Sequence, residues 1–379
     1  MTPAAEKYRL LLDARGLAGR RSGVGKYVSG LVSGIAALQP DDFALRLLCL
    51  PEDNPPAGIE AQILGGFYSG ARPNTVRQHL VMPLKLNKVP RDVYHYPCFD
   101  LPIVRLSQAV VTCHDIEPLV TPHLFARKIV LYYKFFSKRL RSLKNIITIS
   151  GKTATDLVEI IGIERRRIQV IYFGVDECFR PVVDDRQLRD LRRRFVLPDD
   201  YILYVGNTMP HKNLERLILA FSRISSDFPD VCLVIAGAAD RYRNQVRQFV
   251  TDSHLENQVI FLDSISEEDL PLLYSDCRLF AFPSLYEGFG LPVLEAMACG
   301  APVLASDAAS LPEIVGEAGL LVSPLDTKGM ANGLSRILAD KSLADNLSQA
   351  GIQRAADFTW EKCARSHLSF YRRLLGKAA

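Results

Sequence analysis

Apolar residues along this chain fall into short continuous runs, separated by longer segments in which apolar residues recur at helical spacing. The short runs predict buried strands and the longer segments predict helices. Strands are expected at Tyr8–Leu12, Phe43–Leu50, Ile63–Leu64, Asp92–Tyr96, Ala109–Cys113, Asn145–Ser150, Ile168–Tyr172, Tyr201–Val205, Val231–Gly237, Val259–Leu262, Leu279–Pro283, Val303–Ala305 and Leu320–Val322. Helices are expected at Val28–Ile35, Val76–Leu86, Thr155–Ile161, Gln187–Phe195, Leu214–Ile224, Gln245–Ser253, Glu267–Ser275, Leu291–Ala298, Thr327–Ala339, Leu343–Ala356 and Phe358–Leu375. This alternation predicts right-handed βαβ units and parallel sheets, and therefore an α/β protein.

The length of 379 residues suits two domains of ordinary size. The run Phe179–Pro181 follows the strand expected at 168–172 and precedes a helix-rich segment, so it is interpreted as the connection between them. The chain is therefore expected to divide into a first domain ending at residue 181 and a second beginning at residue 182.

The most informative stretch is the segment from Glu287 to Ser306, which predicts a glycine-rich turn, a helix and a short strand. Pro292 stands at an early helix position, where its missing N–H costs nothing, and Gly300 follows the helix end. A helix N-terminus behind glycines offers free N–H groups and partial positive charge, which suits phosphate. Glu287 and Glu295 flank this site and suit sugar hydroxyls on either side of a diphosphate. Alternatively, they are an acid favoured by the helix dipole and an exposed helical glutamate.

Other candidates follow the predicted strands, where ligands meet a parallel sheet. His114 comes directly after the strand 109–113, and Lys212 lies in the loop after the strand 201–205. A satisfied core histidine and a surface lysine are the ordinary alternatives. The turn that contains Gly23 and Gly25 also follows a strand, but it matches neither the dinucleotide-binding nor the P-loop glycine pattern. A plain strand-to-helix turn is the alternative there.

The segments EGFGLPVLEAMACGAPVLAS and VVTCHDIEPL resemble the family 4 retaining nucleotide-sugar glycosyltransferases, and the resemblance extends along nearly the whole chain. It implies the GT-B fold, with two Rossmann-like parallel-sheet domains facing across a cleft. The C-terminal helix of that fold crosses back to the first domain. The domains would then be 1–181 with 359–379, on the acceptor side, and 182–358, which binds the nucleotide sugar.

The resemblance also implies roles for particular residues. Catalytic roles would fall to His114 at the transferred sugar, Glu287 on its hydroxyls and Lys212 on the departing diphosphate. The donor-binding set would be Gly23, Gly25, His211, Lys212, Glu287, Gly288, Phe289, Gly290, Leu291 and Glu295, with Glu295 on the ribose. The family often has a second cation near the lysine, whereas this chain has Asn207 and His211 at the candidate positions. A protonated His211 could replace that cation. His95 is expected to be structural or on the acceptor side.

The implied reaction transfers a hexose, expected to be mannose from GDP-mannose, to a glycan or lipid-linked acceptor in bacterial surface polysaccharide synthesis. UDP-sugar donors, or epimerisation of a nucleotide sugar on the same fold, are the alternatives. A non-catalytic sugar-nucleotide sensor is disfavoured because all four key side chains are present, and a nicotinamide dehydrogenase because the glycine pattern fails. The sequence contains no Asp-x-Asp motif, so neither a metal nor another cofactor is expected.

Composition narrows the cellular setting. The net charge of +4 does not indicate nucleic-acid binding. No signal peptide or membrane-spanning run is recognised, and eight scattered cysteines without a C-x-x-C pair indicate reduced thiols. A cytoplasmic protein is therefore expected. The segment 126–144 is basic, aromatic and free of acids, which favours peripheral contact with the inner face of the membrane. A helix with an ordinary solvated basic face is the alternative.

Overall fold

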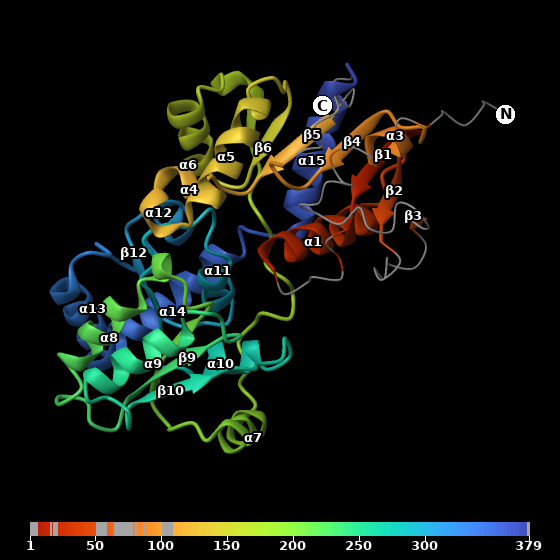
Figure 1. Ribbon diagram of the computed structural model, residues 1–379. Helices are drawn as coiled ribbons and strands as arrows, with labels where there is room; N and C mark the ends of the chain where they lie inside the picture. The colour runs from red at the N-terminus through yellow and green to blue at the C-terminus, as the bar shows by residue number, and fades with distance from the viewer. Residues whose placement is uncertain are drawn as a thin grey trace. The chain divides into compact units, whose positions relative to one another are not determined.

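A computed structural model describes residues 7–15, 17, 22–50, 59–63, 79, 82–86, 88–100 and 109–376 (Figure 1). The chain forms two compact units, 1–174 with 359–379 and 175–358. Each unit is built on one parallel β-sheet with helices on its faces, as the alternating pattern predicts. Within the described residues, no helix combines the length and apolar character needed to cross a membrane.

The sheet of the first unit has seven strands in the described residues, in the order β3-β2-β1-β4-β5-β6-β7. They are β1 (Tyr8–Asp13), β2 (Phe43–Cys49), β3 (Glu60–Ile63), β4 (Val93–Tyr96), β5 (Ala109–Cys113), β6 (Ile146–Thr148) and β7 (Ile168–Val170). The central strands are apolar because helices cover both of their faces; Leu10, Leu11 and Leu12 are all buried. The strand order reverses between β1 and β4, which is where an open α/β sheet offers a ligand crevice.

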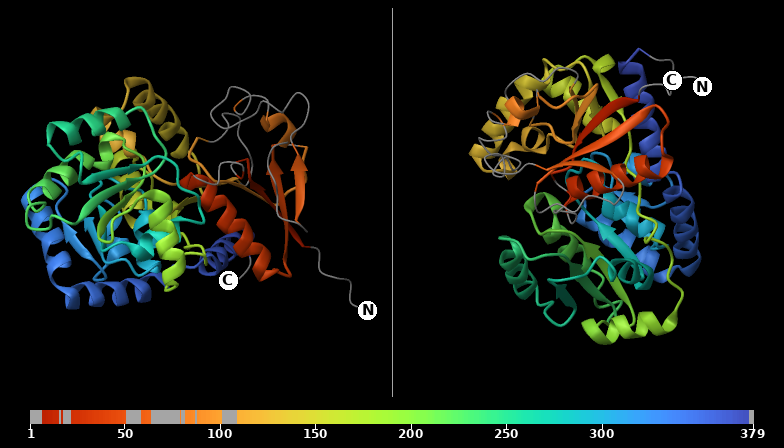
Figure 2. Two further views of the ribbon diagram at one scale, coloured as in Figure 1. Left: turned by 90° about the horizontal axis from the view of Figure 1, so that it is seen from below. Right: turned by 90° about the vertical axis from the view of Figure 1, so that its right-hand side faces the viewer.

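The helices of the first unit include the last helix of the chain. They are α1 (Gly23–Leu38), α3 (Met82–Leu86), α4 (Glu117–Val120), α5 (Arg127–Leu140), α6 (Gly151–Asp156) and α15 (Trp360–Leu374), with the short 3₁₀ helices η3 (Pro122–Leu124) and η5 (Arg165–Arg167) and the π-helix η4 (Leu157–Ile161). Helix α15 packs along α1 (Figure 2). A Cβ on Gly34 would lie 2.6 Å from the Trp360 carbonyl oxygen, so glycine permits this close approach. The predicted return of the C-terminal helix to the first domain is confirmed.

The sheet of the second unit has the order β10-β9-β8-β11-β12-β13. Its strands are β8 (Tyr201–Val205), β9 (Cys232–Ala236), β10 (Val259–Leu262), β11 (Leu279–Phe282), β12 (Val303–Ser306) and β13 (Leu320–Val322). Its helices are α7 (Asp185–Phe195), α8 (Leu214–Ser222), α9 (Arg243–Asp252), α10 (Leu270–Asp276), α11 (Leu291–Ala298), α12 (Leu311–Val315), α13 (Thr327–Ala339) and α14 (Lys341–Ala355), with the turn η6 (Pro210–Lys212). Here the order reverses between β8 and β11.

Some boundaries differ from the sequence-based ones. The first unit ends at Gly174 rather than at residue 181. The reason is that Val175 donates to the Phe358 carbonyl at 3.0 Å and the Phe179 ring lies 6.0 Å from the Tyr274 ring, all within the second unit. Strand β3 begins three residues before the expected start. Residues 64–78 lie outside the described residues. Of the helix expected at 76–86, the structure describes only residues 79 and 82–86. Helix α12 was not predicted.

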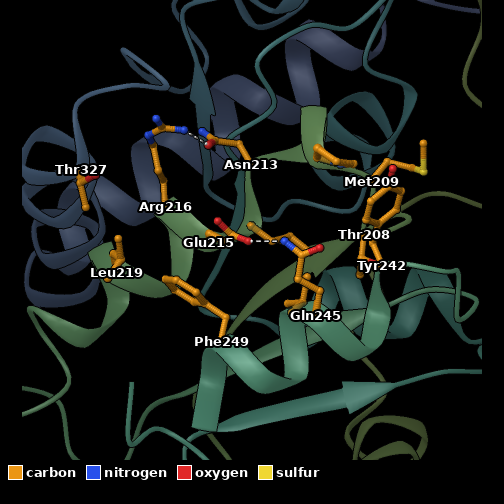
Figure 3. A pocket seen from close by; sticks show the side chains of 13 residues that line it. Thr208, Met209, Asn213, Glu215, Arg216, Leu219, Tyr242, Gln245, Phe249 and Thr327 are labelled. Carbon is orange, nitrogen blue, oxygen red and sulfur yellow. Dashed lines mark hydrogen bonds between the residues drawn. The ribbon is translucent and has the colours of Figure 1, made fainter. Parts of the chain in front are cut away.

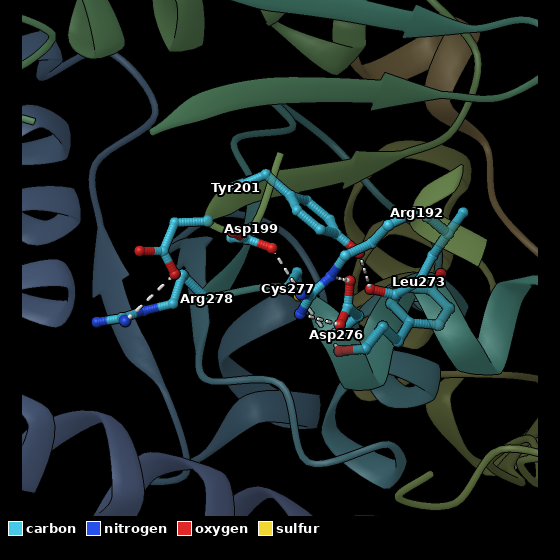
Figure 4. A network of polar contacts seen from close by, with 9 residues as sticks. Arg192, Asp199, Tyr201, Leu273, Asp276, Cys277 and Arg278 are labelled. Atoms are coloured by element: carbon cyan, nitrogen blue, oxygen red, sulfur yellow. Dashed lines mark hydrogen bonds and ion pairs between the residues drawn. The ribbon is translucent and has the colours of Figure 1, made fainter. Parts of the chain in front are cut away.

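A polar cluster at the start of β8 attaches α7 to the second unit (Figure 4). The Arg192 guanidinium donates to both carboxylate oxygens of Asp276, at 2.9 and 2.7 Å, and also pairs with Asp199. The Tyr201 hydroxyl donates to the Leu273 carbonyl at 3.1 Å. Tyr201 is the first residue of its strand, so this cluster lies at the amino edge of the sheet and is structural.

Candidate functional site

The reversal of strand order brings two loops together at the carboxyl edge of the second sheet. One loop follows β8 and carries Lys212; the other follows β11 and carries Glu287. The backbone joins them, because Leu285 donates to the His211 carbonyl at 2.7 Å. The Asn213 side-chain amide donates to the Pro283 carbonyl at 2.9 Å and thereby braces the same pair of loops.

Lys212 and Glu287 form an ion pair in this structure. The Lys212 Nζ lies 2.6 Å from the Glu287 Oε1, and both side chains are 13% exposed. A pair at this depth is accessible to a ligand while being partly shielded from water. Each partner can form a charge-assisted hydrogen bond with a different ligand group, Lys212 with a phosphate and Glu287 with a sugar hydroxyl.

Helix α11 begins beside this pair without a side-chain cap, and the Val293 and Leu294 amides donate to the Gly290 carbonyl, which leaves the Leu291 amide at the helix start. Its N-cap residue is Gly290, which adopts a left-handed conformation with φ of 101° and has no side chain to accept from the first turn. Pro292 occupies the first turn, as the sequence predicts. Phe289 is buried, and its ring lies 6.1 Å from that of Phe358. Because a helix N-terminus carries partial positive charge, the start of α11 directs this charge towards the loop that carries Glu287.

Glu295 occupies a less accessible position than Glu287. It lies within α11, is 2% exposed, and accepts a hydrogen bond of 3.1 Å from the Tyr274 hydroxyl. The two glutamates of the motif therefore differ in environment. Contact of Glu295 with a ribose stays a prediction, and it requires the ligand to reach a carboxylate that Tyr274 holds in the interior.

His211 is uncharged at neutral pH in the ligand-free protein. It is buried, and this burial, together with the neighbouring Lys212 charge, lowers its pKa to about 4. The Asn207 carbonyl accepts from the Tyr204 hydroxyl at 2.7 Å, which fixes the loop but adds no charge. Any contact of His211 with a donor would therefore be made by a neutral imidazole, and Lys212 is the only charged cation of the predicted donor set.

The glycine turn of the first unit begins helix α1. Ser22 is the N-cap, and its hydroxyl oxygen accepts from the Gly25 N–H at 3.0 Å, so this amide is already used. Gly23 differs, because a Cβ there would meet no atom within 4 Å. Gly23 therefore leaves open space beside its Cα.

His114 follows β5 at the carboxyl edge of the first sheet, half-buried and close to two aromatic rings. Its ring centre lies 5.1 Å from that of Tyr27 and 5.6 Å from that of Phe173. The Nε2 atom lies 2.9 Å from the Pro97 carbonyl oxygen, which can only accept, so Nε2 carries the proton. Burial lowers the His114 pKa to about 4. His114 is therefore neutral at pH 7, and its Nδ1 is a hydrogen-bond acceptor.

His367 of α15 belongs to a buried chain of hydrogen bonds in the first unit. Its Nδ1 lies 2.8 Å from the Cys363 carbonyl oxygen and must donate, so its Nε2 accepts from the Tyr27 hydroxyl at 2.8 Å. The Tyr27 oxygen then accepts from the Thr112 hydroxyl, also at 2.8 Å. Every donor along this part of the chain has an acceptor.

His95 completes the chain on the other side of Thr112. Its Nε2–H donates to the Thr112 oxygen at 2.8 Å, and its Nδ1 accepts from the Tyr371 hydroxyl at 2.6 Å. His95 is fully buried, and its pKa is lowered well below the ordinary value by burial. It joins β4 to α15 and is a structural residue.

A pocket of about 370 Å³ lies beside the Lys212 loop, between α8 and α9 (Figure 3). Thr208 and Met209 line it from the loop, Tyr242 and Phe249 from the segment of α9. Lys212 and Glu287 do not line this pocket. Sequence patterns gave no sign of it, because it depends on the packing of two helices.

These observations define the class of protein. Two Rossmann-like units, the C-terminal helix on the first unit and a carboxylate–lysine pair at the switch point of the second sheet are the features of a GT-B glycosyltransferase. The family model for glycosyltransferase family 4 matches residues 21–178, and the model for group 1 glycosyl transferases matches residues 190–354. The chain belongs to the family 4 glycosyltransferases.

Two relatives and one solved structure illustrate this. O-antigen chain mannosyltransferase B of Escherichia coli is 32% identical over 287 residues, which is 74% of each chain. The serotype-specific mannosyltransferase WbdA of the same species is 30% identical over 71% of this chain, but only over 34% of its own length. The fold resembles sucrose-phosphate synthase from Thermosynechococcus elongatus, with a TM-score of 0.79, 24% identity and coverage of 98% and 100% of the two chains.

Proposed function

We propose that this glycosyltransferase transfers mannose from GDP-mannose, with retention of anomeric configuration, to a glycan or lipid-linked acceptor of a bacterial surface polysaccharide. The observation that carries the proposal is the Lys212–Glu287 pair beside the uncapped start of α11. The two E. coli relatives, both named as mannosyltransferases and one of them of O-antigen chains, support the sugar and the pathway class.

The pair suits a substrate that carries both a diphosphate and a sugar. On binding, the diphosphate would take the place of Glu287 beside Lys212, and a sugar hydroxyl would take the place of Lys212 beside Glu287. The glycosidic bond to phosphate then breaks with its electron pair moving to the phosphate oxygen. Lys212 and the Leu291 amide at the start of α11 stabilise the growing charge. The acceptor oxygen bonds to the anomeric carbon and its proton passes to the leaving phosphate.

His114 would take part as a neutral group. Its Nε2–H is engaged with the Pro97 carbonyl, so the Nδ1 lone pair would accept from a hydroxyl of the transferred sugar. A neutral histidine does not compete with Lys212 for the phosphate. We propose that charge stabilisation needs no metal ion, because Lys212 and the Leu291 amide occupy the place where a cation would act.

The donor and the stereochemistry can be tested together. Purified full-length protein is screened by thermal shift against GDP-mannose, UDP-glucose, UDP-N-acetylglucosamine and ADP-glucose. The stabilising donor is then used to label an oligomannoside acceptor, and the anomeric configuration of the product is read by NMR. GDP-mannose should stabilise the protein and yield an α-linked product. Stabilisation by a UDP sugar alone would change the donor, and a β-linked product would overturn retention.

The metal requirement is tested in the same assay with a chelator. Turnover that survives EDTA supports a metal-independent reaction. Turnover that is lost with EDTA and restored by added Mg²⁺ or Mn²⁺ would overturn this part of the proposal.

We also propose that helix α5 contacts an anionic membrane surface. Leu131 and Phe135 lie one turn apart on α5 and are 55% and 51% exposed. The charged side chains on the same exposed face are all cations, namely Arg127, Lys128, Lys134 and Lys138. An apolar pair among lysines and arginines suits the interface of a membrane with anionic lipids.

Vesicle co-sedimentation tests this contact. The protein should pellet with vesicles that contain phosphatidylglycerol and less with pure phosphatidylcholine, and added salt should weaken the binding. The double variant Leu131→Ser/Phe135→Ser should release it, whereas Leu325→Ser, which alters a 65% exposed leucine of the second unit, should not. Equal binding by all variants would contradict the role of α5.

A further inference from the structure

The loop that carries Glu287 turns two of its carbonyl groups towards one hydroxyl. The Ser310 Oγ lies 3.0 Å from the Glu287 carbonyl oxygen and 2.9 Å from the Phe289 carbonyl oxygen. A hydroxyl carries one proton, so it is shared between the two acceptors as a three-centre hydrogen bond. Ser310 is fully buried, so water does not compete for this proton.

The direction of these carbonyls fixes the direction of two amides. In a trans peptide the N–H points opposite to the C=O of the same plane, and all described peptides are trans. The N–H groups paired with the Glu287 and Phe289 carbonyls belong to Gly288 and Gly290. Both N–H groups therefore point away from Ser310, and within the described residues neither donates to a protein acceptor. The result is a pair of amides directed to one side of the loop, next to the N-terminus of α11.

Ser310 makes this contact instead of the one its position favours. It is the N-cap of α12, where a serine oxygen ordinarily accepts from an amide of the first turn. Its side chain makes no such cap hydrogen bond. The segment Ser310–Glu313 even matches the S-x-x-E capping pattern. The hydroxyl that this pattern would assign to α12 is used on the neighbouring loop.

A second contact joins α12 to the same loop. A Cβ on Gly290 would lie 2.5 Å from the Leu311 Cδ2, so glycine allows α12 to approach the loop closely. Leu311 is fully buried. Helix α12 thus supports the loop at Gly290 by packing and at Glu287 and Phe289 by hydrogen bonding.

We propose that Ser310 is a positioning residue of the transferase. Its shared hydroxyl holds the Gly288 and Gly290 amides in the direction in which they donate to an oxygen of the donor beyond the α-phosphate. That oxygen belongs to the β-phosphate or to the transferred sugar. The inference rests on the proposed function, because it assumes that a nucleotide sugar binds at this loop.

The test compares ligands that contain and lack these oxygens. Calorimetry measures the affinity of wild type, Ser310→Ala and Ser275→Ala for GDP-mannose, GDP and GMP. The matched control Ser275 also binds through its hydroxyl oxygen, to the Val182 N–H at 3.0 Å, but touches no residue of the 287–290 loop. Turnover is measured with a mannosyl acceptor, and thermal midpoints report any general loss of stability.

Ser310→Ala should weaken the affinity for GDP-mannose about tenfold, while the affinity for GMP stays within about twofold of the wild-type value. The expected effect is smaller than the loss of about 10²-fold or more for a direct oxyanion donor, because Ser310 acts through the backbone. An equal loss for GDP locates the contact at the β-phosphate, and a loss confined to GDP-mannose locates it at the sugar. Ser275→Ala should leave all three affinities unchanged. A Ser310→Ala protein with an unchanged ratio of GDP-mannose to GMP affinity overturns the inference.

Two further outcomes are distinguishable. If the wild type binds no guanosine, uridine or adenosine diphosphate sugar, the proposed function fails and Ser310 has no donor to position. If Ser310→Ala does not fold, Ser310→Cys provides the same comparison, because a thiol still fills the space of the hydroxyl, although it is somewhat larger, and donates only weakly. A Ser310→Cys protein that retains the wild-type ratio overturns the inference as well.

Discussion

The two sheets carry polar side chains in two different states. At the first sheet, His95, His367 and Tyr27 satisfy one another in a buried chain of hydrogen bonds that ends on α15. At the second sheet, Lys212 and Glu287 satisfy each other across 2.6 Å while each is still 13% exposed. The first arrangement has no capacity left for a ligand, whereas the proposed function requires the second to exchange its internal partner for groups of a substrate.

The difference shows how a structural polar cluster differs from a candidate site in the same fold. The structural cluster is fully buried, uncharged and complete, so it fixes one packing of α15 on the sheet. The Lys212–Glu287 pair is charged and incompletely buried, and it lies beside amides for which the described residues provide no acceptor. His114 is intermediate, because one nitrogen is engaged with Pro97 and the other is an available acceptor.

Acid should break the first arrangement, with the largest expected effect on stability. Burial lowers the His367 pKa to about 4, compared with 6.5 for an ordinary histidine. Between these values the unfolded chain binds the proton and the folded chain does not. Stability is therefore fully present above about pH 6.5 and falls as the pH decreases towards 4. This histidine alone accounts for about 3 kcal/mol over that range.

Urea unfolding at pH 7.5 and 5.0 measures this loss. The single tryptophan of the chain is Trp360, at the start of α15, so its fluorescence reports on the first unit. His367→Gln, which cannot take up the proton, should reduce the pH dependence, while His254→Gln on the surface should not. An undiminished pH dependence in His367→Gln would rule out this histidine as the source.

Removal of Lys212 should have the largest effect on catalysis. Lys212→Ala or Glu287→Ala should lower turnover about 10²-fold or more, because each removes a group that stabilises or positions the reacting centre. Arg278→Ala serves as control, since Arg278 pairs with Asp200 at 3.3 Å on an exposed surface of the same unit. Initial rates at saturating donor and acceptor decide the point. Near-normal turnover in either variant would refute the assignment of the pair.

Sequence reasoning reached the fold and the placement of the charged residues of the candidate site for a clear physical reason. Parallel strands of both sheets are buried on two faces, so their apolar runs are visible, and the loops after them must meet at one edge. This placed His114, Lys212 and Glu287 at the carboxyl edges. The same reasoning located Pro292 and Gly300 at the two ends of α11, because each has a position-specific backbone role.

What sequence reasoning missed depends on tertiary packing. A protonated His211 was one candidate for the second cation, but its burial keeps it neutral. Glu295 shares a motif with Glu287, yet Tyr274 from α10 holds it in the interior. Helix α12 is only five residues long, and its capping pattern would have assigned the Ser310 hydroxyl to the wrong partner. None of these environments can be recognised from the spacing of residue types along the sequence.

A smaller effect is expected from Tyr371→Phe, which sharpens the comparison at the first sheet. The variant removes the hydroxyl that donates to His95 Nδ1 at 2.6 Å and leaves that buried nitrogen without its donor. The cost should be about 1–3 kcal/mol of stability, with normal turnover in the folded protein. Urea unfolding followed by Trp360 fluorescence measures the change.

The matched variant for Tyr371→Phe is Tyr201→Phe, which removes a buried hydroxyl from the second unit. It should leave the unfolding midpoint seen by Trp360 unchanged if the two units unfold separately. A fall in the turnover of folded Tyr371→Phe would contradict the purely structural assignment of the His95 chain.

The smallest effect is expected from Gly23→Ala, which tests whether Gly23 of the first unit contributes to the donor site. A Cβ at residue 23 meets no atom within 4 Å, so stability should change by less than about 0.5 kcal/mol. Gly34→Ala in the same helix is the contrasting variant, because its Cβ would lie 2.6 Å from the Trp360 carbonyl oxygen and should destabilise the α1–α15 contact. If the donor approaches Gly23, the added methyl group should raise the KM for GDP-mannose by about twofold, equivalent to about 0.4 kcal/mol, with an unchanged thermal midpoint. An unchanged KM would remove Gly23 from the donor-binding set and leave the predicted donor contacts of the first unit to His114 and Gly25.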